Sequence, residues 1–495
     1  MKSENSSGRE RAGNQTRGTQ PALATAGARQ RFSGRDLYAL GFGLFLGLAM
    51  VKFGNPVILD QKIVPPATLS EAWNSAWPLH WAGWWLAPLA LIGCWLIITA
   101  RPGCPGPRWL WVLPAIWFGW QLLAAMQTVD RQLTTITLWH FAGCLACYFL
   151  GALLLGEKPR LHWLLVGVLA AFAFCLVRAV NQRLVEFPQE RKMLLEGQHT
   201  GWTNFPPEVF AQMQRDQIII TTNGVEAANP VILEKYAKGR VMGTLVYPNA
   251  LAGAVLLLLP VSLALAVNGT RRFRPTTRAT AISLTLFLGG AGLFWSGSKS
   301  GWLIVLVLGG IWLFRLRWPA RWKFTLLVAV VAIGLAAFAI RFHGYFASGA
   351  TSVSARFDYW RAAAQITREF PWLGSGPGTF QHPYAKLKAP EAEMARLTHN
   401  DFLEQFCDSG IIGGLSYAIW IGLLLAMIGR RVWNRGEPLL FAGFLGLLGW
   451  FAQGLGEFSL YIPALAWTAF TLGGCLLRAS ANPIQRQLSH AGPGT

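Results

Sequence analysis

Charged residues are scarce in this 495-residue chain. Asp, Glu, Lys and Arg make up 13% of it, whereas 53% of the residues are hydrophobic. Soluble domains carry roughly 25% charged residues, so the composition argues against two or three soluble domains. No charged residue falls near the middle of any long apolar run. Intramembrane charges usually mark ion or proton pathways, and their absence argues against a transporter.

The sequence also has few features of cofactor or metal sites. It has seven Cys, and Cys144 and Cys147 have metal-site spacing without a second pair. The long polar stretches 181–245 and 342–410 contain no Asp-x-Asp, the usual sign of a metal and nucleotide-sugar site. The Gly-rich stretch "LGSGPGTF" (373–380) is not followed by Gly-Lys-Ser/Thr, as a phosphate-binding loop would be. We therefore predict no cofactor and no metal.

Long apolar runs dominate the chain instead. A run of about 20 apolar residues spans a bilayer core, and such runs favour an all-α polytopic membrane protein. The twelve candidate spans are 36–53, 84–100, 109–126, 134–155, 161–179, 246–268, 279–295, 301–316, 324–341, 411–429, 438–455 and 460–477.

Basic residues orient these spans. With a cytoplasmic N-terminus, the inner loops 101–108, 158–160, 271–278, 315–323 and 430–435 hold 15 Lys and Arg, against Lys52, Lys62, Arg131 and Lys299 in the short outer connections. The positive-inside rule therefore predicts that both termini are cytoplasmic. The same asymmetry accounts for the net charge of +20, so nucleic acid is not a predicted partner.

This topology divides the chain into seven segments. Two long loops on the outer, periplasmic side hold most of its polar residues. The segments are a disordered basic cytoplasmic tail (1–35), five spans (36–180), the first periplasmic loop (181–245), four spans (246–341), the second periplasmic loop (342–410), three spans (411–478) and a cytoplasmic tail (479–495).

The second periplasmic loop ends in "LTHNDFLEQFCDSGIIGG" (397–414). Thr398 and Asp401 match a capping box, which predicts a helix starting at His399. Ser409-Gly410 is typical of a helix end before the next span. A His in a first turn feels the positive end of the helix dipole, which favours its neutral, proton-accepting form. The alternative is a His that only packs at the membrane surface.

Three cations lie near membrane boundaries on the same side. Arg356 is predicted in the first turn of a helix that starts after Ser354 and stops at Phe370-Pro371, where it either binds an anion or stacks on Trp360. Arg240 ends the first periplasmic loop, and Lys299 lies in a short outer turn. Three cations beside a possible base suit a polyanionic leaving group on a lipid.

Four stretches in this order resemble the O-antigen ligase and polymerase superfamily of bacterial polysaccharide enzymes. They are "GRVMGTLVYPNALAG" (239–253), "SGSKSGW" (296–302), "ARFDYWRAAAQITREFPWLGSGPGTF" (355–380) and "THNDFLEQFCDSGIIGG" (398–414).

The resemblance implies a helical multi-span glycosyltransferase of the bacterial inner membrane. Its donor would be an undecaprenyl-pyrophosphate-linked glycan, and its acceptor a glycan, a lipid A core or a protein. It implies that Arg240, Lys299 and Arg356 bind the diphosphate and that His399 is catalytic, in a metal-independent, inverting reaction. Asn249 and Asn400 would be supporting residues. Lys299 stands where many members have Arg, which keeps the charge but loses the planar fork.

Three activities share this signature: ligation to lipid A core, repeat-unit polymerisation and protein O-glycosylation. The sequence does not separate them. A transporter of lipid-linked sugars or small anions is the alternative from another class.

The charge asymmetry predicts that both long loops are periplasmic. Single Cys residues at Gln198 and Lys386, in a Cys-depleted background, should react with a membrane-impermeant thiol reagent in intact cells. A folded protein that is labelled at neither position would show that the orientation is wrong.

Overall fold

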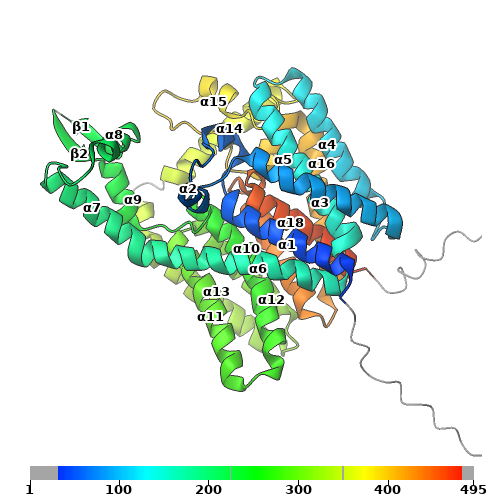
Figure 1. The fold of residues 1–495 in the computed structure, drawn as a ribbon. Coiled ribbons are helices and arrows are strands. Elements are labelled where there is room, and N and C mark those ends of the chain that lie inside the picture. Colours follow the sequence, from blue (N-terminus) through cyan, green and yellow to red (C-terminus); the bar gives the residue numbers. More distant parts are fainter. Residues whose placement is uncertain (1–31, 223, 348–350, 482–495) are drawn as a thin grey trace, which may run out of the picture.

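The computed structural model describes residues 32–222, 224–347 and 351–481. Most of the two predicted cytoplasmic tails, 1–31 of the first and 482–495 of the second, lies outside these ranges. Within the described ranges the chain is almost entirely helical (Figure 1). The predicted fold class, an all-α polytopic membrane protein, is confirmed.

Nine helical segments of the described ranges are long and apolar enough to cross a membrane. Some of them join two neighbouring elements. They are α1 (Gly34–Lys52), α3 (Leu79–Ala100), α4 with η2 (Trp109–Gln127), α5 with η3 (Arg131–Leu155), α6 through η4 and α7 (Lys158–His199), α10 with η5 (Pro248–Arg272), α11 (Pro275–Ser296), most of α13 (Ala320–Ala347) and α16 (Asp401–Trp433).

The other three predicted spans are shorter helices. They are α12 (Lys299–Arg315), α17 (Pro438–Gln453) and α18 (Pro463–Ala479), of 17, 16 and 17 residues. A 17-residue helix is about 25 Å long, just short of the bilayer core. Every residue of α18 is buried, and it packs against α1, α5, α16 and α17. It is therefore the central helix of the bundle and faces protein on all sides.

Small residues bring the first helices close together. α1 packs along α6 (Lys158–Asn181), and a Cβ on Gly43 would overlap the Leu164 carbonyl. Helices in membranes associate largely by such close backbone contact.

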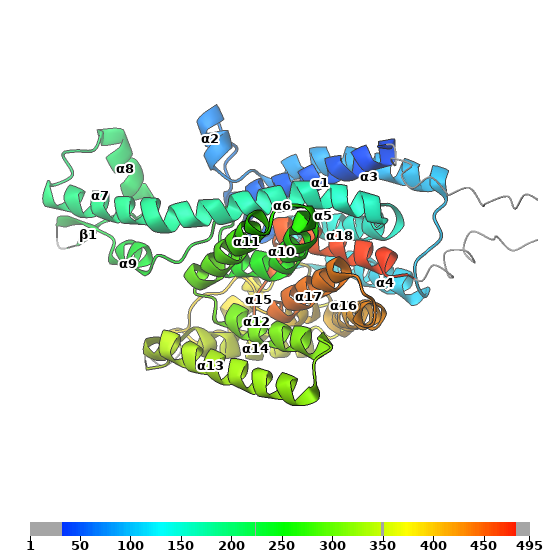
Figure 2. The ribbon, with the colours of Figure 1, turned by 90° about the horizontal axis from the view of Figure 1, so that it is seen from below.

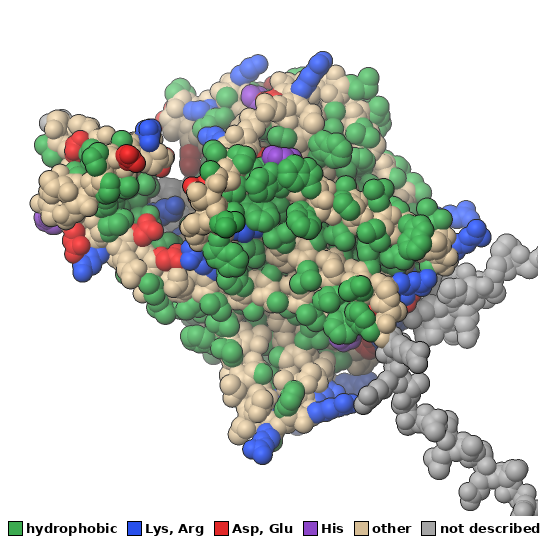
Figure 3. Space-filling model, in the orientation of Figure 1, with side chains coloured by type: hydrophobic (Ala, Val, Ile, Leu, Met, Phe, Trp, Pro, Cys, Tyr) green, Lys and Arg blue, Asp and Glu red, His purple; other side chains and the backbone are tan. Residues whose placement is uncertain are grey.

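Around the bundle, Figure 3 shows hydrophobic side chains spread over the middle of the molecule, with most charged side chains of this face around its rim. The surface fits an apolar belt facing lipid.

The first predicted periplasmic loop folds into a lobe that projects from the bundle (Figures 1 and 2). α6 continues through a π-helical turn, η4 (Gln182–Glu186), into α7 (Phe187–His199), so one rod crosses the predicted boundary at 181. The lobe adds α8 (Pro207–Arg215), the hairpin β1 (Ile219–Thr222) and β2 (Val225–Ala228), and α9 (Pro230–Lys238). This antiparallel hairpin, with Ile219 opposite Ala228, is the only sheet in the described ranges.

A side chain in the π-helical turn holds the segment that leaves the lobe. Gln182 Oε1 accepts from the backbone N–H groups of Met242 (3.1 Å) and Gly243 (2.8 Å), and its Nε2 donates to the Gly243 carbonyl (2.9 Å). The chain next to Arg240 is therefore fixed to the rod.

The second predicted periplasmic loop is also largely helical. It contains α14 (Thr351–Glu369) and α15 (Gln381–Leu387). α14 stops before Phe370-Pro371, as predicted, but it begins at Thr351 rather than after Ser354. Ser354 therefore lies within the helix rather than at its N-cap. Arg356 consequently lies in the second turn, and the predicted placement in the first turn is wrong.

The predicted break at Ser409-Gly410 is confirmed. Gly410 has φ 67° and ψ −167° inside α16, which separates a short helix from the span that follows. The break lets the Ile411 N–H donate to the Pro371 carbonyl (2.8 Å). A Cβ on Gly410 would lie 2.5 Å from that oxygen and from Trp372.

We expect Gly410→Ala to destabilise the protein, because the backbone conformation is one that L-residues rarely adopt. Such strain costs about 1–3 kcal/mol, measured as a lower melting temperature of the purified protein. Gly422→Ala in the same helix is the control, since nothing lies within 4 Å of its added Cβ. Equal melting temperatures for the two variants would contradict this account.

Candidate functional site

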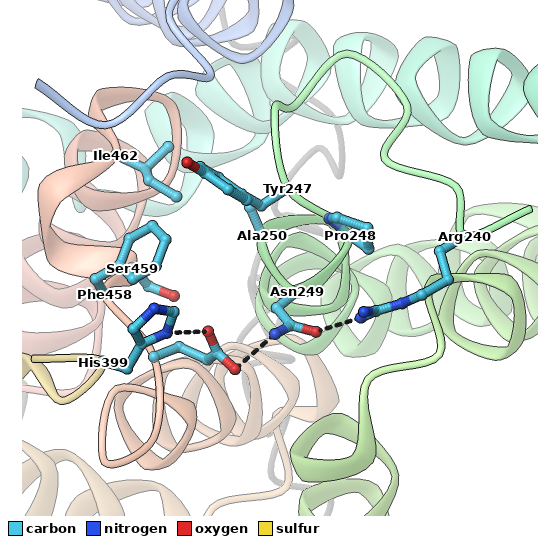
Figure 4. Close-up of a pocket in the computed structure, with 10 residues that line it drawn as sticks. Arg240, Tyr247, Pro248, Asn249, Ala250, His399, Phe458, Ser459 and Ile462 are labelled. Atoms are coloured by element: carbon cyan, nitrogen blue, oxygen red, sulfur yellow. Dashed lines mark hydrogen bonds and ion pairs between the residues drawn. The ribbon is translucent and has the colours of Figure 1, made fainter. Parts of the chain in front are cut away.

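Three of the predicted site residues line one pocket of about 100 Å³, together with Glu457 (Figure 4). Arg240 follows α9, Asn249 lies in the first turn of α10, and His399 precedes α16. The other lining residues are Tyr247, Pro248, Ala250, Phe458, Ser459 and Ile462.

Arg240 is placed by the turn that ends the lobe. Gly239, with φ 57°, ends α9 in the left-handed conformation. The Arg240 guanidinium then donates through Nε to the Ser296 carbonyl (2.8 Å) and through Nη2 to Asn249 Oδ1 (3.0 Å). Burial lowers the pKa of Arg240, and so does the positive charge of Arg356, while the Glu457 carboxylate opposes both. An Arg stays charged despite such a shift.

Glu457 is the functional candidate that the sequence analysis missed. It lies between α17 and α18, its side chain is 6% exposed, and it contacts three of the predicted site residues. Oε1 accepts from Arg356 Nη2 (2.6 Å) and Asn249 Nδ2 (2.7 Å), and Oε2 lies 3.5 Å from His399 Nδ1. A signal was present, because Glu457 is the single charged residue between Glu437 and Arg478.

Arg356 reaches the site from α14. Besides its ion pair with Glu457, its Nε is buried and has no hydrogen-bond partner among the described residues. Because Arg356 lies in the second turn, the expected anion site between it and the first turn is not supported. The guanidinium instead lies beside the pocket, and its Nε is not bonded by any residue that the structure describes.

His399 lies one residue before the N-cap of α16. The prediction of a helix starting at His399 and capped by Thr398 is wrong, because Asn400 is the N-cap: its Oδ1 accepts from the N–H groups of Phe402 (3.0 Å) and Leu403 (3.1 Å). Thr398 instead bonds the backbone of Asn400, and the Asp401 carboxylate accepts from the Leu460 N–H.

The backbone conformation of His399 and the neighbours of its ring place the imidazole at the pocket. The residue has φ 53°, a left-handed conformation. Its ring lies between Tyr359 and Phe458, with ring centroids 5.8 Å and 4.7 Å away. The side chain is 31% exposed, so the imidazole is held by two aromatic rings and still reaches the pocket.

Lys299 is the first residue of α12, directly after the turn at Ser296–Ser298. Its Nζ lies 5.3 Å from the centre of the Phe342 ring. Burial, together with the positive charges of Arg240 and Arg356, lowers the pKa of Lys299 to about 8, although Glu457 opposes these effects. The three predicted cations therefore share one electrostatic environment.

The two predicted supporting residues have different roles. Asn249 bridges Arg240 and Glu457 through its side-chain amide. Asn400 caps α16, and its Nδ2 donates to the Leu455 carbonyl (3.0 Å). Since the Asp401 N–H also donates to the Gly454 carbonyl (2.7 Å), Asn400 fixes the His399 segment against the segment that carries Glu457.

Residues 284–418 match a protein family described as O-antigen ligase. The resemblance to the O-antigen ligase family is confirmed. The matched region contains Lys299, Arg356 and His399, whereas Arg240, Asn249 and Glu457 lie outside it. An uncharacterized protein of Haemophilus influenzae is 30% identical over 154 residues, which cover 26% of this chain and 37% of that protein. This chain is thus a multi-pass membrane protein in which residues 284–418 are similar to the O-antigen ligase family.

Three convergent cations predict that the site binds a multivalent anion such as inorganic pyrophosphate. Lys299 is charged below its pKa of about 8 and loses that charge as the pH rises through it. We therefore expect pyrophosphate affinity to weaken by up to about tenfold between pH 8 and 9, measured by calorimetry on the purified protein.

Lys299→Arg is the matched control, because a guanidinium stays charged over this range. Pyrophosphate itself also titrates, but this affects both proteins equally and cancels when one pH profile is subtracted from the other. Identical profiles would show that Lys299 does not contact the anion.

Proposed function

We propose that this protein is a glycosyltransferase of the O-antigen ligase type. It transfers a glycan from an undecaprenyl-pyrophosphate donor to an acceptor hydroxyl at the periplasmic face of the bacterial inner membrane. The observation that carries the proposal is the convergence of Arg240, Lys299 and Arg356 around the segment that presents His399.

The cations suit the leaving group of this reaction. As the bond between the anomeric carbon and the diphosphate oxygen breaks, negative charge develops on the diphosphate. Fixed cations in a partly buried site stabilise that charge directly, so the reaction needs no metal. Arg240 and Arg356 supply guanidinium groups suited to phosphate oxygens, and Lys299 supplies a point charge.

His399 suits the other half of the reaction. The acceptor oxygen forms a bond to the anomeric carbon from the side opposite the diphosphate, and its proton passes to the imidazole. Such a direct displacement inverts the anomeric carbon. The imidazole acts as a general base, a role that typically contributes about a hundred- to ten-thousand-fold in rate.

Ligation to lipid A core, repeat-unit polymerisation and protein O-glycosylation remain alternatives for the acceptor. The lobe formed by α7, α8, β1, β2 and α9 leads directly into Arg240, and we propose that it selects the acceptor. The transporter alternative gains no support from the site, because its cations gather at one end of the bundle rather than along the helices.

We expect His399→Ala to bind lipid-linked donor normally and to transfer about a hundredfold or more slower, because only the proton acceptor is lost. The measurement is donor binding and turnover, made separately on the purified protein. EDTA should leave wild-type turnover unchanged.

His382→Ala is the matched control. His382 also pairs with a carboxylate on this side, with Nε2 3.0 Å from Asp130 Oδ2, but neither residue lines the pocket. Near-normal turnover of His399→Ala would remove the base assignment, and loss of donor binding alone would make His399 a diphosphate ligand.

A further inference from the structure

Glu457 has no part in the reaction as proposed so far, yet it contacts three of the predicted site residues. One oxygen accepts from Arg356 (2.6 Å) and Asn249 (2.7 Å), and the other lies 3.5 Å from His399 Nδ1. Its side chain is only 6% exposed. A carboxylate that is nearly removed from water needs such partners, because an isolated buried charge is strongly unfavourable.

The negative charge of Glu457 lies where an anionic substrate would have to bind. It pairs directly with Arg356 and, through the Asn249 amide, is linked to Arg240. A diphosphate that binds the Arg356 guanidinium through Nη2 must compete with this carboxylate, because Glu457 Oε1 already accepts from that nitrogen. The internal carboxylate is therefore a competitor for the proposed donor.

The contact between Glu457 and His399 is not a well-formed hydrogen bond. A separation of 3.5 Å between Nδ1 and Oε2 is longer than a well-formed hydrogen bond. His399 Nδ1 and Arg356 Nε are both buried without a hydrogen-bond partner among the described residues. Glu457 thus fully satisfies neither residue while it is shared between them.

We propose that Glu457 is a positioning residue that couples donor binding to the activation of His399. When a diphosphate takes over Arg356, Glu457 is released to accept a hydrogen bond from His399 Nδ1–H. This bond leaves Nε2 free to take the acceptor proton, and the carboxylate stabilises the imidazolium that forms. The inference rests on the proposed function, and it makes donor binding precede acceptor activation.

The test compares anion binding with turnover in the full-length protein in detergent. Binding of inorganic pyrophosphate is measured by calorimetry, and transfer is measured with lipid-linked glycans extracted from source cells that lack the protein. Glu457→Gln removes the competing charge, so pyrophosphate should bind about tenfold tighter. Transfer should fall at least about tenfold, because His399 loses its partner.

Glu157→Gln is the matched control, because Glu157 also pairs with arginines, Arg160 at 3.0 Å and Arg478 at 3.5 Å, but on the predicted cytoplasmic side. It should change neither quantity. Opposite changes in binding and transfer support the coupling. A parallel loss of both would indicate a merely structural Glu457, and unchanged transfer would remove its link to His399. Either result overturns the proposal.

Glu457→Asp keeps the charge and tests the same idea if the Gln variant does not fold. Its shorter side chain should still compete for Arg356, so pyrophosphate binding stays within about threefold of wild type, whereas transfer falls because the carboxylate withdraws further from His399. Wild-type transfer by Glu457→Asp would overturn the positioning role.

Arg356→Ala separates this inference from the proposed function. If the wild-type protein does not transfer glycan, or binds pyrophosphate no better than Arg356→Ala, the proposed function itself fails. If the wild type does both and Glu457→Gln loses both in parallel, only the role of Glu457 fails.

Discussion

The ion pair between Arg356 and Glu457 is the interaction on which the site depends. Its atoms are 2.6 Å apart, and its side chains are 22% and 6% exposed. At such burial the loss of hydration can outweigh the attraction between the charges, unless further hydrogen bonds satisfy them. Asn249 provides one of these bonds. The pair thereby joins α14, the start of α10 and the α17–α18 connection, which are distant in sequence.

Three buried carboxylates, in the short helix that follows His399, hold the neighbouring loops in place. Asp401, Glu404 and Asp408 lie in the short helix before the Gly410 break and are all buried. Their oxygens accept from the backbone N–H groups of Leu460, Thr398 and Gly378, respectively, and Asp408 also pairs with the Tyr461 hydroxyl. Since burying an unpaired polar group is costly, these bonds fix the loops around His399 to a rigid element.

The sequence predicts the membrane architecture well because long apolar runs have one main structural solution. It also places Arg240, Lys299, Arg356 and His399 on one side, because successive spans cross the membrane in alternating directions and so determine which loops share a side. Local capping signals are less decisive: Thr398 and Asn400 both suit an N-cap, and the tertiary contacts of Asp401 with Leu460 favour the second. Glu457 was missed because its partners lie 58 to 208 residues away in sequence. Its isolation between two apolar runs marks it as unusual but does not show which residues it contacts.

The long rod formed by α6, η4 and α7 positions the backbone that follows Arg240. Gln182, in the π-helical turn, bonds the backbone at Met242 and Gly243, two and three residues after Arg240. The length of α6 therefore sets the position of Arg240 along the axis of this rod. The lipid-linked diphosphate of the proposed reaction would be held at the bilayer surface by its own anchor, so its depth would be fixed as well. One added residue in α6 would turn the Gln182 side chain by about 100° around the helix axis, so that it would no longer face the backbone at Met242 and Gly243.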